Sequence, residues 1–230
     1  MHNVCVLAPR RRLALPLALL LPALLLSGCS ESGDDAKAAP KSSGSPTPSS
    51  TVKVPQGISL TDQGSKLKFG DTSRVIFESA KGRGSVLQLR VTSVRRGSLA
   101  DFKGFILDDD YKKKAAYYYA HVQVKNVGDG DVGGVPVPVW GVNADNTLLP
   151  AVNFTTGFPR CPSKPLPSSF GPGKSLDTCL VYLSPNRSAL TAVSYRPSQQ
   201  FNPIVWQGTV GKPIRPAATK KAGASRSATP

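Results

Sequence analysis

The chain has 230 residues, with 29 lysines and arginines against 14 aspartates and glutamates, a formal net charge of +15. A balance this basic favours anionic surroundings. Two histidines and four cysteines leave little material for a histidine-based catalytic triad or a four-ligand zinc site.

The N-terminal residues predict an export signal. Arg10, Arg11 and Arg12 precede an apolar run from Leu13 to Leu26, which is the layout of a secretory signal. The run has 14 residues and two prolines, whereas a span that stays in the bilayer needs about 20 apolar residues. Export by the general or the twin-arginine route stays open, because arginine pairs mark the latter.

The apolar run ends in Leu-Ser-Gly-Cys at residues 26–29, which resembles the lipobox of bacterial lipoproteins. The resemblance implies that the thiol of Cys29 receives a diacylglyceryl group and that cleavage removes the signal peptide, residues 1–28. Two or three acyl chains hold a protein durably at a membrane, because each buried methylene contributes about 0.8 kcal/mol. We therefore expect a lipid-anchored protein on the extracytoplasmic face of the bacterial cell membrane. The alternative is a secreted protein without an anchor.

Once the signal peptide is removed and Cys29 is acylated, Cys161 and Cys179 are the two cysteines that remain. In an oxidising compartment we expect them to form one disulfide, and closing a loop of this length stabilises a fold by about 3 kcal/mol in the chain-entropy model. A metal is the competing use, but structural zinc takes four ligands and the mature chain has one histidine, His121. We expect no metal site and no cofactor.

Composition divides the mature chain into three parts. Residues 29–57 are rich in Ser, Pro, Ala and Gly and predict a disordered tether. Residues 58–211 are long enough for one domain with a proper core. Residues 212–230 predict a disordered basic tail, whose cations are Lys212, Arg215, Lys220, Lys221 and Arg226.

The central part has a hydrophobic period of two, which is typical of half-buried strands. Leu87, Leu89 and Val91 alternate with polar residues, and residues 118–125 place His121 on the more polar face. Further short strands are predicted at residues 74–78, 135–142, 178–183, 190–195 and 203–208. The one predicted helical turn follows Ser98, which can cap it with Asp101 three residues on. Many short strands and no long helical pattern predict an all-β antiparallel sandwich.

Four stretches, residues 117–131, 158–162, 170–185 and 190–198, resemble the immunoglobulin-like domain of secreted actinobacterial lipoproteins and antigens. The resemblance implies an immunoglobulin-like sandwich in which Cys161 pairs with Cys179 and ties a proline-rich loop to the start of a strand. Many members have no assigned activity, so the resemblance implies little about function.

Three motifs have a sharper interpretation that we weigh against a structural one. Gly128–Gly133 fits a dinucleotide-binding pattern, but prolines follow where a helix must begin, and a turn is favoured. A weak calcium site on that loop stays open. Asp108–Lys114 places three carboxylates beside three ammonium groups and predicts a solvated hairpin loop. His121 has no recognisable nucleophile partner, so we predict no catalytic residues.

Charge supplies the last prediction. Loss of the signal removes three arginines and no acid, so the mature chain keeps 26 basic and 14 acidic residues and a net charge of +12. An exported protein rarely meets nucleic acid, and the nearer partners are anionic lipids, wall polymers or another envelope protein. We expect a lipid-anchored binding or accessory module of the cell envelope. The alternative is an envelope enzyme that acts on glycans through paired carboxylates.

Overall fold

Alternating apolar residues build two sheets in the computed structural model, which describes residues 51–154 and 156–213. The predicted signal peptide, Cys29, most of the tether and the tail beyond Pro213 lie outside the described residues. The strands are β1 (Lys66–Lys68), β2 (Thr72–Ala80), β3 (Arg83–Arg96), β4 (Ala116–Asn126), β5 (Trp140–Asn143), β6 (Leu148–Leu149), β7 (Ser175–Ser184), β8 (Leu190–Tyr195) and β9 (Ile204–Gln207). Three short helical segments join them: η1 (Leu99–Phe102), α1 (Asp110–Lys114) and η2 (Pro185–Arg187).

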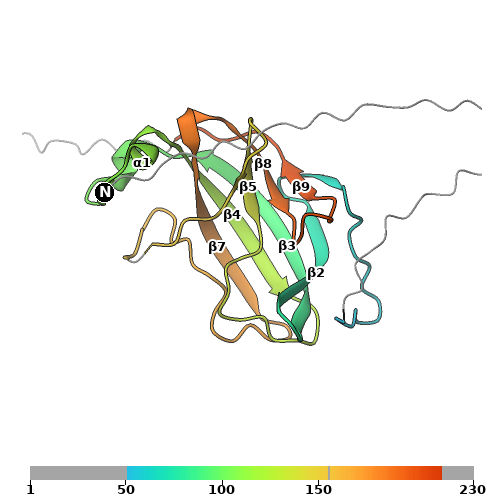
Figure 1. The fold of residues 1–230 in the computed structure, drawn as a ribbon. Coiled ribbons are helices and arrows are strands. Elements are labelled where there is room, and N and C mark those ends of the chain that lie inside the picture. The colour runs from blue at the N-terminus through green and yellow to red at the C-terminus, as the bar shows by residue number, and fades with distance from the viewer. Residues whose placement is uncertain (1–50, 155, 214–230) are drawn as a thin grey trace, which may run out of the picture. The chain divides into compact units, whose positions relative to one another are not determined.

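The two sheets form a sandwich, as the sequence predicted (Figure 1). One sheet has the order β2-β3-β4-β7 and the other β1-β9-β8-β5-β6, and every pairing is antiparallel except β1 with β9. The chain changes sheet after β1, after β4, after β6 and after β7. Strands β3, β4 and β7 therefore correspond to A, B and E of an immunoglobulin domain, and β5, β8 and β9 to C, F and G. The expected immunoglobulin-like fold is confirmed.

The main core lies between the sheets. Leu87, Leu89 and Val91 of β3 are fully buried in it, which confirms the predicted alternation. Trp206 of β9 is also fully buried and donates its indole N–H to the carbonyl of Asp71 at 3.0 Å. Tyr182 of β7 donates its hydroxyl to the carbonyl of Val139 at 3.1 Å, so the polar atoms of both large side chains are satisfied.

A second apolar cluster covers the other face of β4 and β7, and the sequence did not predict it. Its buried members are Phe102, Tyr117, Tyr119, Phe158, Cys161, Cys179 and Val181. The side chain of Phe158 stacks on that of Phe102 with ring centroids 4.8 Å apart. This second cluster forms where two connections, residues 97–107 and the described part of residues 150–163, fold over the outer face of β4 and β7.

The helical segments correct one prediction and confirm another. Asp109 caps α1 by accepting a hydrogen bond from the backbone N–H of Lys112 at 2.6 Å, so the predicted hairpin loop at residues 108–114 is wrong. The side chains of these residues pair three and four positions apart, which favours a helical turn. Segment η1 begins after Ser98, as predicted, and the N–H of Ser98 donates to Asp101 at 2.8 Å. No helix within residues 51–213 is long and apolar enough to cross a membrane.

Candidate functional site

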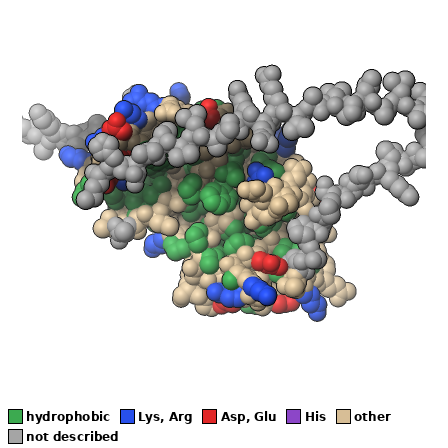
Figure 2. Space-filling model, in the orientation of Figure 1, with side chains coloured by type: hydrophobic (Ala, Val, Ile, Leu, Met, Phe, Trp, Pro, Cys, Tyr) green, Lys and Arg blue, Asp and Glu red, His purple; other side chains and the backbone are tan. Residues whose placement is uncertain are grey.

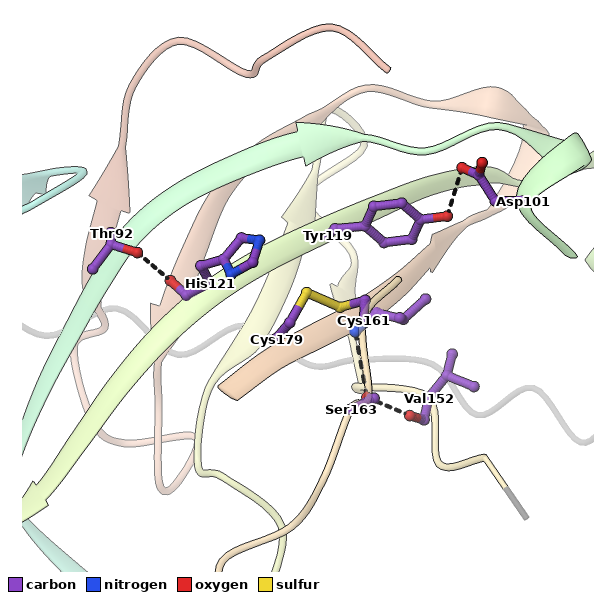
Figure 3. Close-up of a disulfide and its surroundings, with 9 residues drawn as sticks. Thr92, Asp101, Tyr119, His121, Val152, Cys161, Ser163 and Cys179 are labelled. Atoms are coloured by element: carbon purple, nitrogen blue, oxygen red, sulfur yellow. Dashed lines mark hydrogen bonds between the residues drawn. A yellow bond between two sulfur atoms is a disulfide. The ribbon is translucent and has the colours of Figure 1, made fainter. Parts of the chain in front are cut away.

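The disulfide joins Cys161 to Cys179, as predicted, with their Cα atoms 4.9 Å apart (Figure 3). Cys161 comes from the long connection between β6 and β7. Cys179 lies in the middle of β7, not at the start of a strand as expected, because β7 begins at Ser175. The bond therefore fixes the connection against the middle of β7, the edge strand of the four-stranded sheet.

Ser163 holds the same connection through three hydrogen bonds. Its N–H donates to the carbonyl of Cys179 at 2.7 Å, and its hydroxyl donates to the carbonyl of Val152 at 2.6 Å (Figure 3). The N–H of Val181 donates to the same hydroxyl at 3.3 Å. Ser163 is buried and has a φ of 48°, a left-handed conformation that is costly for any residue other than glycine. Its neighbours Pro162 and Lys164 thus have fixed positions.

Asp101 links the two connections that cover the outer face of the sheet, residues 97–107 and 150–163. Its side chain is 4% exposed and pairs with the guanidinium of Arg160 at 3.0 Å. The hydroxyl of Tyr119 donates to the other carboxylate oxygen at 2.9 Å. Burial, followed by the hydrogen bond to Asp101, raises the pKa of Tyr119, so this phenol remains a donor at any physiological pH.

A hollow of about 490 Å³ lies on the outer face of the four-stranded sheet, next to the two covering connections. Its floor is the outer face of β3, β4 and β7, and its wall is the segment after the disulfide. The lining residues are Thr92, His121, Val122, Gln123, Pro162, Lys164, Leu176, Asp177, Thr178 and Cys179. Figure 3 shows Thr92 and His121 on neighbouring strands beside the disulfide. The hydroxyl of Thr92 donates to the carbonyl of His121 at 3.2 Å.

The chemistry of the hollow is that of polar recognition. His121, Gln123, Lys164 and Asp177 offer an imidazole, an amide, an ammonium and a carboxylate. By strand register, Gln123 lies between Arg90 and Asp177 on this face. Glycosidases use a pair of carboxylates, and this hollow has one, Asp177. Within residues 51–154 and 156–213, no three His, Cys, Asp or Glu side chains gather where they could hold a metal.

The other predicted site residues do not come together here. Cys29, Arg215, Lys220, Lys221 and Arg226 lie outside the described residues. Lys212 is exposed and follows Gly211, which pairs with Arg95 at the end of β3. The loop at Gly128–Gly133 contains no helix, which confirms the turn. Asp131 in that loop accepts hydrogen bonds from Gly133 and Phe170.

The alternation of residues 118–125 predicted His121 and Gln123 on the polar face, but the sequence did not predict the other residues of the hollow. The alternation of β7 could have placed Asp177 on the same face as Cys179, since residues two apart share a face of a strand. No local pattern could have placed Pro162 and Lys164 above that face, because the disulfide and Ser163 bring them there.

Comparison of the chain with protein-family models, with curated proteins and with solved structures found no match.

Proposed function

We propose that this protein is a bacterial lipoprotein whose immunoglobulin-like domain binds a polar component of the cell envelope in the hollow beside the disulfide. The lipobox at residues 26–29 supports an acyl anchor on Cys29 and a location at the extracytoplasmic face of the membrane. A disulfide is the expected state of a cysteine pair in that compartment, and Cys161 and Cys179 are bonded.

The rigid wall of the hollow is the observation that carries the proposal. Pro162 and Lys164 stand on either side of Ser163, which is hydrogen-bonded to Cys179 and Val181 of β7 and to Val152, and lies next to a disulfide. A site that is ordered before its ligand arrives loses little conformational entropy on binding. The polar side chains opposite this wall, His121 and Gln123, extend from one strand, β4, which pairs with β7. A preformed hollow with a few convergent polar groups is the usual form of a ligand site.

The anchor has its own test. Replace Cys29 by Ser and label growing cells with a fatty-acid analogue. We expect the unchanged chain to be labelled and to sediment with membranes, and the variant to do neither. A variant that is still labelled and retained would show that the anchor is elsewhere.

The hollow is tested with matched variants of the full chain. Gln123→Ala with Lys164→Ala removes two polar side chains from the hollow, and Gln199→Ala with Lys174→Ala removes the same residue types from exposed positions elsewhere. We expect binding to isolated cell envelope to fall about thirtyfold in the first variant, since two lost hydrogen bonds of about 1 kcal/mol each amount to about 2 kcal/mol, and to be unchanged in the second. Equal binding by both variants would remove the hollow from the proposal.

The basic tail is a second proposed contact. Lys212, Arg215, Lys220, Lys221 and Arg226 form a run of cations without an acid between them, and such runs bind anionic surfaces in a salt-sensitive way. Removal of residues 214–230 should therefore weaken binding to the envelope at low salt more than at high salt.

A further inference from the structure

The described chain begins and ends at opposite ends of the sandwich. At the start, Val52 lies beside the β2–β3 turn, so close that a Cβ placed on Gly84 would be 2.3 Å from its side chain. At the finish, Gly211 pairs with Arg95. Strand β3 runs from the first place to the second, and its 11 steps from Gly84 to Arg95 cover about 37 Å at about 3.4 Å per residue. Figure 1 shows the blue start of the described chain and α1 at the two ends.

Three cationic residues have neighbouring backbone positions where the described chain finishes. Gly211 donates its N–H to the carbonyl of Val94 and accepts the N–H of Arg96, each at 2.8 Å. These bonds put Lys212 next to Arg95 and Arg96, and all three side chains are exposed. We call Arg95, Arg96 and Lys212 the cationic end.

Four acidic residues at this end of the sandwich are paired with cations, and a fifth, Asp145 between β5 and β6, accepts a hydrogen bond from Asn143 at 3.4 Å. Asp101 is paired with Arg160, Asp108 and Asp109 with Lys112, and Asp110 with Lys114. The hydrogen bond from Lys112 is the largest cause that lowers the pKa of Asp108. Figure 2 shows these acidic and basic side chains intermixed where Figure 1 places α1. Within the described part of the chain, no carboxylate forms an ion pair with the cationic end.

We infer that the cationic end binds an anionic polymer of the cell wall, on the side of the domain that faces away from the membrane. The inference rests on the proposed function for the acyl anchor on Cys29. It adds a fixed, folded contact to the proposed tail, which continues from the same point with Arg215 and three more cations.

The reach of the tether favours wall polymer over lipid. If the 23 residues from Cys29 to Val52 form the flexible tether that the sequence predicts, their root-mean-square span is about 26 Å, and they join the domain at the end that lies about 37 Å from the cationic end along β3. Charges at an exposed surface act over about 8 Å at physiological salt. With the tether at its mean span, the end of the domain near Val52 lies closer to the membrane than the cationic end. The cationic end then contacts lipid head groups only if the domain turns over, whereas it contacts a polymer outside the membrane without turning.

The test compares two charge reversals of equal size in the full chain. Arg96→Glu with Lys212→Glu changes the cationic end, and Lys53→Glu with Lys81→Glu makes the same change in net charge at the tether end, where both lysines are exposed. Each chain is inserted into phosphatidylcholine vesicles, and capture of fluorescent long-chain polyphosphate is measured between low and physiological salt. We expect the first reversal to lower affinity about tenfold at low salt and the second less than about twofold.

Two results overturn the inference. Equal losses in both variants mean that net charge alone attracts the polymer. A wild-type chain that ignores polyphosphate but gathers on phosphatidylglycerol vesicles has lipid as its partner. If the first variant melts at a lower temperature than the wild type, Arg96→Gln with Lys212→Gln takes its place, with Lys53→Gln and Lys81→Gln as the control.

The proposed function can fail separately. Polymer capture that survives Gln123→Ala with Lys164→Ala assigns it to the cationic end, whatever the hollow binds. If a Cys29→Ser chain still captures polymer through Arg96 and Lys212, the contact does not need the acyl anchor. The binding part of the inference then stands, and the part that places the contact away from the membrane is dropped.

Discussion

Ser163 is the residue on which the wall of the hollow depends. Its left-handed backbone, with a φ of 48°, is a cost that its three hydrogen bonds offset. We predict that Ser163→Ala and Ser163→Gly both lower the free energy of unfolding, because the buried N–H of Val181 loses its partner at a cost of about 1–3 kcal/mol. Alanine should be worse than glycine by about 1 kcal/mol, since glycine adopts this conformation without strain. Denaturant unfolding of the two variants measures the order, and a more stable alanine variant would contradict it.

Asp131 makes stability depend on pH. Its carboxylate accepts N–H bonds from Phe170 at 2.9 Å and Gly133 at 2.8 Å, and a hydroxyl bond from Ser169. These bonds, the one from Phe170 first, lower its pKa. A carboxyl whose folded pKa lies below the unfolded value, about 3.9, stabilises the fold above that pH and loses its contribution as pH falls through the folded pKa.

We therefore predict that Asp131→Asn melts at a lower temperature than the wild type at pH 7, and that the difference shrinks below about pH 4. Thermal melts between pH 2.5 and 7 measure it. Asp129→Asn, two residues away, is the control, since Asp129 is exposed and forms no ion pair with another described residue. A difference that stays constant over the whole range would mean that shape, rather than charge, explains the effect.

At the scale of elements, the second cluster packs the two covering connections firmly against the four-stranded sheet. Phe158 is 2% exposed and packs against Phe102, Phe154 and Tyr119. Phe158→Ala should lower the free energy of unfolding by about 3–5 kcal/mol, because it leaves a cavity among aromatic rings. Ile106→Ala, at an 86% exposed position of the same cover, should cost under about 0.5 kcal/mol. Urea unfolding of both variants distinguishes a packed cover from a loose loop.

The elements also show how far the sequence could lead. The alternation in β4 predicted that Tyr118, Ala120 and Val122 face the main core, and they do. It could not predict that Tyr117 and Tyr119 are buried on the opposite face, because their cover comes from Phe102 and Phe158 in other parts of the chain. The hydrophobic pattern of a strand predicts which face of that strand packs on the core. It does not predict which distant segments cover the opposite face.

Short and interrupted elements set a second limit. Residues 135–142 predicted one strand, but β5 begins only at Trp140, since Pro136 and Pro138 lack the N–H that a ladder needs. Strand β1 has three residues, two of them lysines, and it exists because β9 supplies a partner. For the site, the sequence predicted the disulfide and the polar face that holds His121. It could not predict that Lys164 and β4 line the same hollow, because the fold brings them together.

At the scale of the whole molecule, the proposed acyl anchor on Cys29 predicts an orientation of the domain, because Val52 and Gly211 lie at opposite ends of the sandwich. Lys81 lies in the β2–β3 turn beside Val52, and Lys103 follows η1 at the end where Arg96 lies; both side chains are exposed. With Cys29 acylated and Cys161 bonded to Cys179, a new cysteine is the single reactive thiol of the mature chain. We predict that a dye on Lys81→Cys transfers more energy to an acceptor in the membrane than a dye on Lys103→Cys, because the tether joins the domain near residue 81. Full chains in vesicles provide the measurement, and residues 51–213 without an anchor are the control for random encounters. Equal transfer from both positions would mean that the tether lets the domain tumble freely, and stronger transfer from residue 103 would mean that the cationic end faces the lipid.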